Sequence, residues 1–350
     1  MKRLLLAGAA AMALSPAALG DNIADAHGPI GVMGEHTHHQ GEVMFSYRYM
    51  RMEMSGNRVG TDSISPDEIV TTIPNVNAPP ATLRVVPTDM SMDMHMFGAM
   101  WAPNDRVTLM AMLPYIEKEM DHTTYMGMAG TTELGTFTVK TDGFGDAKVS
   151  ALFSLSHTET DRLVAGVGLT LPTGSIDETA AVLTPMNTTP TLRTPYAMQL
   201  GSGTYDPFGS ITWARNTGTW GFGAQGSALL RLHDNDEDYH LGDEFKATAW
   251  TSYAFSPAAS ASLRLSGQSI GQIDGADAMI AAPVQTANPD FYGGERIDFG
   301  IGLNLIGQSG AIAGHRLAFE ISTPIYEDLN GPQMETDLTA TIGWQYAFGG

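Results

Sequence analysis

The connections between the strand-like segments of this chain are long and short in turn. About a dozen segments alternate apolar and polar residues, which is typical of β-strands with one apolar face. The longest connections are 55–91, 118–144, 173–206 and 271–296. Shorter or intermediate ones lie at 103–105, 157–161, 215–218, 234–242, 256–257, 307–314 and 327–336. Outer-membrane barrels join their strands in this way, whereas a soluble sandwich has no reason to alternate its loop lengths.

Each segment also carries enough apolar residues on one side to face lipid. In 162–172, for example, Leu163, Val167 and Leu169 oppose Arg162 and Gly166. A membrane strand needs about 9–11 residues, and the segments are of that length. With 93–102 included they number twelve, and an even number returns the C-terminus to the periplasmic side. The sequence therefore predicts an all-β fold: a single antiparallel transmembrane β-barrel of about 12 strands over residues 41–350, with short periplasmic turns and long extracellular loops.

The N-terminus has the features of an export signal. Met1-Lys2-Arg3 precede an apolar run from Leu4 to Leu14, and small residues follow up to Gly20. We expect residues 1–20 to be a signal peptide, with cleavage after Gly20 or as late as Ala26. Residues 21–40 are then a histidine-containing periplasmic segment or plug. The predicted location is the outer membrane.

The net charge of the chain and its lack of catalytic motifs narrow the range of possible functions. The formal net charge of −20 argues against nucleic acid as a partner. No metalloprotease helix motif and no nucleophile-elbow motif occurs in the sequence, so we do not expect an enzyme. The expected partners are outer-membrane lipid and lipopolysaccharide, the barrel-assembly machinery, and a small-molecule or metal-ion solute. The prediction is a monomeric channel for passive passage of a small solute, and a barrel enzyme or purely structural barrel is a further alternative.

The polar face of the strands predicts which residues line the interior of the barrel. A strand in hydrocarbon buries charge only inward, so charged residues opposite the apolar face should line the lumen. Their signs are mixed, which indicates internal ion pairs. The predicted lumen-lining residues are Arg48, Asp146, Lys148, Arg162 and Glu320.

Methionine and histidine suggest a second interpretation. Of the 21 methionines, fifteen lie between Met33 and Met128, and the strand alternation turns many of them inward. Thioether sulfur selects Cu(I), and imidazole can join it. The competing interpretation is that methionine is a flexible filler of an irregular lumen wall. No cofactor is certain, and the alternative function is copper binding or transport. Its candidate ligands are His36, His38, His39, Met92, Met94, Met96, Met110 and Met112.

A short helix is predicted in the first long connection. Ser65-Pro66-Asp67-Glu68 combines a serine cap, a proline at the first helical position and an acidic residue at the third.

Several stretches resemble a family of outer-membrane transporters labelled MetA-pathway of phenol degradation. They cover residues 31–213 best. They are Gly31-Val32-Met33-Gly34-Glu35-His36, Ser46-Tyr47-Arg48-Tyr49-Met50, Ile64-Ser65-Pro66-Asp67-Glu68, Pro87-Thr88-Asp89-Met90, Ala102-Pro103-Asn104-Asp105-Arg106, Gly143-Phe144-Gly145-Asp146, Leu171-Pro172-Thr173-Gly174 and Gln199-Leu200-Gly201-Ser202-Gly203. The resemblance implies an outer-membrane β-barrel and small-molecule transport, and its pathway label is a weak guide to the solute.

Overall fold

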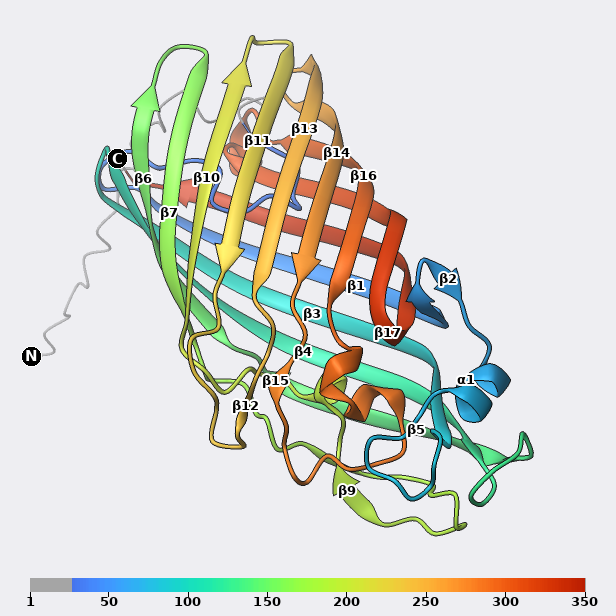
Figure 1. The fold of residues 1–350 in the computed structure, drawn as a ribbon. Coiled ribbons are helices and arrows are strands. Elements are labelled where there is room, and N and C mark those ends of the chain that lie inside the picture. The colour runs from blue at the N-terminus through green and yellow to red at the C-terminus, as the bar shows by residue number, and fades with distance from the viewer. Residues whose placement is uncertain (1–26, 350) are drawn as a thin grey trace, which may run out of the picture.

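The computed structural model describes residues 27–349, so the predicted signal peptide lies outside the described residues. An antiparallel sheet closes on itself through pairing of its first and last strands, β1 and β17 (Figure 1). In ring order the strands are β1 (Val43–Gly60), β3 (Val85–Asn104), β4 (Val107–Tyr125), β6 (Ala147–His157), β7 (Asp161–Leu171), β10 (Asp206–Asn216), β11 (Trp220–Leu229), β13 (Glu244–Ser256), β14 (Ala259–Ile270), β16 (Gly294–Ile306) and β17 (His315–Phe348). The ring therefore has eleven labelled strands.

Strand β17 crosses the wall twice. Its first half pairs with β16 as far as Leu329, and its second half pairs with β1 from Leu329 onward. The reversal lies next to Gly331, whose φ of 68° suits a tight turn. The wall therefore has twelve crossings, which confirms the predicted barrel. The prediction of a mid-length connection at 327–336 was wrong, because these residues continue the sheet up to this turn.

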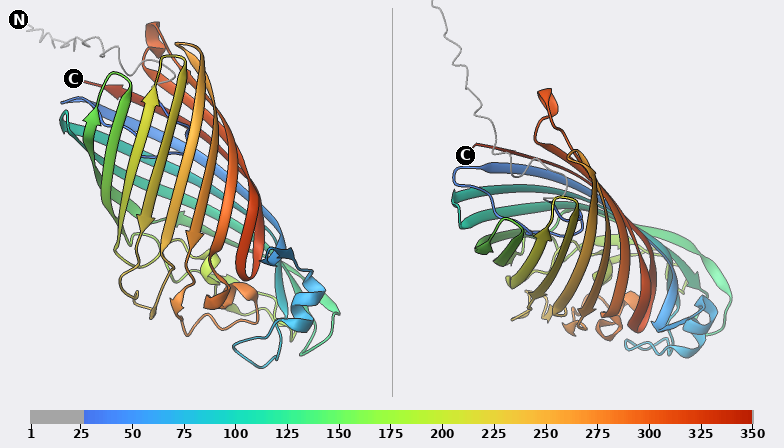
Figure 2. Two further views of the ribbon diagram at one scale, coloured as in Figure 1. Left: turned by 45° about the horizontal axis from the view of Figure 1, so that its top comes forward. Right: turned by 90° about the horizontal axis from the view of Figure 1, so that it is seen from above.

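The two faces of the wall have the predicted chemistry. Apolar side chains such as Phe255 and Ile301 point outward and are 64% and 57% exposed. Polar side chains such as Arg264 and Glu320 point inward and are 7% and 4% exposed. Because the outward belt runs round the whole ring shown in Figure 2, lipid rather than water is its natural surroundings. Exposed aromatic residues, including Trp101, Trp220 and Phe348, mark the short-turn end of this belt.

The connections differ at the two ends of the barrel. Short turns and the strand ends Val43 and Phe348, which pair, lie at one end, here called the turn end. At the other end, the loop end, lie α1 (Pro66–Thr72) and the short strands β2 (Asp62–Ser63), β8 (Thr179–Ala181), β9 (Thr191–Arg193), β12 (Tyr239–His240) and β15 (Asp274–Gly275) (Figure 1). Single 3₁₀ turns occur at Tyr196–Met198, Gln285–Ala287, Pro289–Phe291 and, at the turn end, Gly310–Ile312.

The expected long connection at 118–144 is mostly strand, and that prediction was wrong. β4 continues to Tyr125, and β5 (Glu133–Phe144) pairs with it along this extension. β6 pairs with the other half of β4, so β5 and β6 form one wall strand interrupted at 145–146. The exposed residues of β4 in this extension, Glu117, Glu119 and Asp121, are all acidic and do not suit contact with lipid. The outward face of the extension therefore lacks the apolar residues by which strands were predicted.

The predicted loop helix is confirmed as α1. Ser65 is its N-cap, and the main-chain N–H of Glu68 donates to the Ser65 hydroxyl at 3.3 Å. Its buried residues Ile69 and Val70 pack in one cluster with Leu83, Val86 and Tyr125. Among residues 27–349, no helix is both long and apolar enough to cross a membrane.

Candidate functional site

The N-terminal segment, residues 27–42, runs inside the barrel. Three wall side chains donate hydrogen bonds to its main-chain carbonyls. Arg316 donates to Gly28 at 2.6 Å, Arg48 to Ile30 at 3.0 Å, and Gln225 to Met33 at 2.8 Å. Two of these donors come from β17 and β1, which are neighbours, and the third comes from β11, which lies across the ring from them. The N-terminal segment therefore crosses the lumen instead of lining one wall.

Contacts with other strands complete this docking. Arg162 on β7 forms an ion pair with Glu35 at 2.7 Å. The main-chain N–H of His38 donates to the Thr108 hydroxyl on β4 at 2.9 Å. Val32 belongs to a buried cluster with Ala214 of β10 and Trp250 of β13. Seven wall strands thus contact one short segment.

Gly31 explains part of this fit. A Cβ placed on Gly31 would collide with Glu320 and come within 2.9 Å of the guanidinium carbon of Arg264. Arg264 and Glu320 form a buried ion pair at 2.7 Å on the lumen side of β14 and β17. Only a residue without a side chain lets the main chain pass so close to this pair.

A cavity of ≈ 420 Å³ lies between the N-terminal segment and the outer loops. Met33 of the N-terminal segment lines it on one side, and Leu200, Leu241 and Tyr292 of the loops line it on another. Its wall is largely apolar and carries a few charged groups, among them Lys148. A second cavity of ≈ 180 Å³ shares Met33 and Lys148 with the first, so the two lie side by side along the lumen.

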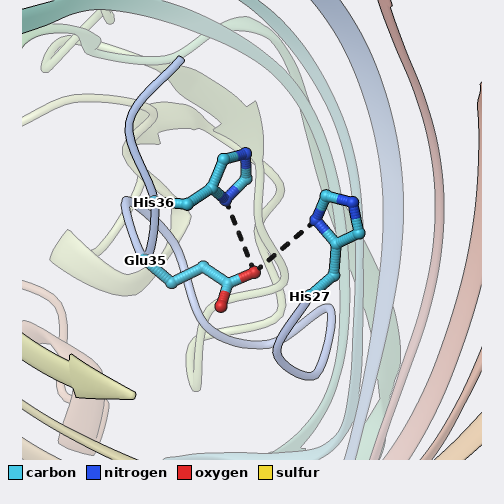
Figure 3. A group of neighbouring side chains, drawn as sticks. All are labelled: His27, Glu35 and His36. Carbon is cyan, nitrogen blue, oxygen red and sulfur yellow. Dashed lines mark ion pairs between the residues drawn. The ribbon is translucent and has the colours of Figure 1, made fainter. Parts of the chain in front are cut away.

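The N-terminal segment also brings three potential metal ligands together, as Figure 3 shows. Glu35 Oε1 lies 3.5 Å from His36 Nδ1 and 3.9 Å from His27 Nδ1. The His27 and His36 rings contact each other edge-on, with centroids 5.1 Å apart. His38 extends the row, because its ring centroid lies 5.0 Å from that of His36.

Neighbouring charges set the protonation of this cluster. Burial alone raises the pKa of Glu35, but the Arg162 guanidinium and the hydrogen bond with His36 hold that pKa well below its ordinary value. Burial lowers the pKa of His27, and the nearby Arg316 lowers it further. At neutral pH Glu35 is therefore a carboxylate and His27 is a neutral imidazole with a lone pair.

The five residues predicted to line the lumen have these positions. Arg48 and Arg162 hold the N-terminal segment, and Glu320 pairs with Arg264. Lys148 and Asp146 line the main cavity. Asp146 also accepts hydrogen bonds from the main-chain N–H groups of Gly174 and Ser202, at 2.9 Å and 2.7 Å, and so ties the third outer loop to the wall.

The predicted metal ligands are only partly brought together. His36 lies beside Met96, Met110 and Met112 in a small lumen cavity. Met94 lines the main cavity, and Met92 lies further toward the loop end, opposite Met52. His38 is buried near Glu42, with Nδ1 and Oε2 3.4 Å apart. The side chain of His39 is 61% exposed beside Asp105 at the turn end, away from the cluster.

Two residues of the cluster were absent from the predicted ligand set. Glu35 and His27 face His36 because the N-terminal segment folds back between positions 27 and 36. Only the local sequence Glu35-His36 could have drawn attention to the carboxylate. Nothing in the spacing of His27 indicates that it lies near His36.

Comparisons with known proteins agree with the fold. The family model labelled MetA-pathway of phenol degradation matches residues 84–304, which is more than half of the chain. None of the curated proteins compared with the chain matches it.

One solved structure has the same overall fold, and two others are more distantly similar. An outer-membrane channel from Pseudomonas putida F1 superposes with a TM-score of 0.57 and 15% identity, covering 90% of this chain and 98% of that one. A FadL homologue from Pseudomonas aeruginosa gives a TM-score of 0.44 at 8% identity, over 88% and 90% of the two chains. The Pseudomonas putida toluene transporter TodX gives 0.41 at 9% identity, over 87% and 89%. By its family match, this chain belongs to the family labelled MetA-pathway of phenol degradation.

Proposed function

We propose that this protein is a non-enzymatic outer-membrane channel that passes a small, largely apolar solute. The observation that carries the proposal is the cavity of ≈ 420 Å³ enclosed by a lipid-facing barrel. A cavity of this size lies in the range of small-molecule sites, which are mostly apolar with a few polar groups. The shared fold with an outer-membrane channel from Pseudomonas putida F1 supports the same function.

The residues that line the cavity indicate which class of solute it accepts. Ten methionine, leucine and isoleucine side chains line it, including Met94, Met112, Leu229 and Ile273, and its surface is mostly apolar. Such a surface gains free energy by burying apolar groups and offers little to a fully hydrated ion. Lys148 gives one polar contact that can orient a solute. Lipid, with lipopolysaccharide in the outer leaflet, is the environment we propose for the exposed belt, and barrel-assembly machinery is the route of insertion.

Uptake of an apolar fluorescent probe tests the proposal. Lipopolysaccharide slows the entry of N-phenylnaphthylamine into intact Gram-negative cells, and the probe brightens once it reaches apolar surroundings. We expect cells that carry the protein to take it up faster than cells that lack it. Leu229→Trp, which fills the cavity, should remove most of this gain, because Leu229 lines both lumen cavities.

Leu263→Trp is the matched control. Leu263 is 47% exposed on the lipid face, where an added indole does not meet the cavity. Equal amounts of folded protein are verified by the heat-dependent shift of its gel band. Uptake that does not depend on the protein, or that both tryptophan variants reduce equally, would contradict the proposed channel.

A further inference from the structure

The donor atoms of His27, Glu35 and His36 have a spacing that suits one metal ion. The ligand atoms of the three residues all lie within 4.8 Å of one another, and the carboxylate oxygen is 3.5 Å and 3.9 Å from the two imidazole nitrogens. Two donors that bind one tetrahedral ion at about 2.0–2.1 Å lie roughly 3.4 Å apart. A small inward movement of two side chains therefore completes a coordination sphere. The Gly28 N–H, which donates to the same carboxylate oxygen at 2.7 Å, and Arg162 fix the orientation of Glu35.

Thioethers surround the same place. The small cavity next to His36 and Glu35 is lined by six methionines, Met33, Met44, Met96, Met100, Met110 and Met112. They come from the N-terminal segment and from β1, β3 and β4, where Met44, Met100 and Met110 pair across adjacent strands. Methionine also fills irregular gaps, so the argument for a site rests on the placement of these six thioethers beside two imidazoles. Thioether sulfur is a soft ligand that suits Cu(I) and discriminates against hard cations.

The local charge favours a monovalent ion. Arg162 already neutralises Glu35, while Arg48 and Arg316 hold the neighbouring main chain. A second positive charge on the ion would meet these guanidinium groups at close range in a poorly screened interior. A singly charged ion bound at His27, Glu35 and His36 avoids most of that repulsion.

We propose that His27, Glu35 and His36, with the adjoining methionine wall, form a Cu(I)-binding site inside the barrel. The site lies on the N-terminal segment and goes beyond the channel function proposed above. Solute uptake and metal binding are read out separately, so either proposal can fail without the other.

Competition with a chromophoric Cu(I) chelator tests the site. The full mature protein in detergent is titrated with Cu(I) under ascorbate, and the chelator reports how much copper the protein withholds. We expect one high-affinity Cu(I) per chain. The double variant His27→Ala/His36→Ala should bind Cu(I) more than about tenfold less tightly, because both imidazole ligands are gone.

His39→Ala is the matched histidine control, since the His39 side chain is 61% exposed outside the cluster. We expect its Cu(I) affinity to equal that of the parent. Met96→Leu/Met112→Leu keeps side-chain volume nearly unchanged and should weaken Cu(I) binding severalfold. Barrel folding is verified in each variant by heat-dependent gel mobility, and X-ray absorption of the bound copper should show both nitrogen and sulfur neighbours.

Four results would overturn the proposal. These are the absence of tight Cu(I) binding, equal binding by the His27→Ala/His36→Ala variant, a loss of binding in His39→Ala, and preferential binding of Zn²⁺ at the same residues. Unchanged Cu(I) affinity in the methionine double variant would also contradict the proposal, because the methionine wall is part of the proposed site.

Discussion

At the scale of single residues, Glu35 joins the N-terminal segment to the wall. One of its carboxylate oxygens accepts from Gly28 within the segment, and the other pairs with Arg162 of β7. Glu35 is 4% exposed, and the Arg162 side chain is 17% exposed. Because a largely buried ion pair is costly to break from one side, this carboxylate holds the segment in place.

Replacing Glu35 should therefore loosen the N-terminal segment. In Glu35→Gln the Arg162 guanidinium loses its carboxylate partner, which costs about 3–5 kcal/mol when a buried pair is broken from one side. We expect a protease added to the folded protein to cleave within residues 27–42 much faster than in the parent. Glu53→Gln is the control, since Glu53 pairs with Arg51 in an exposed position. Equal cleavage of parent and Glu35→Gln would show that the ion pair does not hold the segment.

At the scale of elements, the extension formed by β4 and β5 depends on a buried arginine. Arg84 is fully buried and donates hydrogen bonds to the carbonyls of Met126, Gly127 and Gly130, at 3.0, 3.2 and 2.7 Å. These carbonyls belong to the turn between β4 and β5. One side chain immediately before β3 thus satisfies three polar groups of the turn.

Arg84→Met should release this turn without unfolding the barrel. Met126 and Gly130 lie in an exposed turn, so the loss is that of the three hydrogen bonds, each worth about 1.5–3 kcal/mol when the donor is charged, and the turn should become more mobile. Hydrogen–deuterium exchange is expected to rise over residues 126–132 and to stay unchanged in β10 and β11. Arg106→Met, at an exposed turn on the other end, is the control. Protection of residues 126–132 that survives the Arg84 substitution would contradict this role.

The sequence predicts the strands that face lipid, but it does not predict the strand segments that extend beyond the lipid-facing wall. Strands such as 162–172 could be predicted because lipid imposes an apolar residue at every second position. Residues 133–144 face water or outer loops, so their strand has no such pattern. The turn beside Gly331 lies within the connection predicted at 327–336, but that connection was predicted too long, because the residues on either side of the turn lack a regular apolar alternation.

The candidate site could be predicted only in part. The alternation placed Met96, Met110 and Met112 inward, and they lie with His36 around one small cavity. The path of the N-terminal segment has no periodicity, so the approach of His27 to His36 had no signal in the sequence. The exposure of His39 likewise follows from where the segment leaves the lumen.

At the scale of the whole molecule, the protein is a closed wall with lipid outside and a nearly filled interior. The N-terminal segment closes the turn end, the long loops cover the loop end, and the main cavity lies between them. Met112 lines both the main cavity and the small cavity that Glu35 and His36 also line. The accessibility of position 112 to a reagent in solution therefore reports whether the N-terminal segment occupies the lumen.

The reaction rate of one engineered thiol tests this account most directly. The chain has no cysteine, so Met112→Cys introduces a single thiol, and Met186→Cys on an exposed outer loop is the control. A charged, water-soluble maleimide is added to each folded protein, with residues 27–40 either present or deleted. The account predicts that Cys at position 112 reacts slowly in the full chain and at least about tenfold faster after the deletion, while the control reacts quickly in both. Equal rates at position 112 with and without residues 27–40 would contradict a barrel closed by its own N-terminal segment.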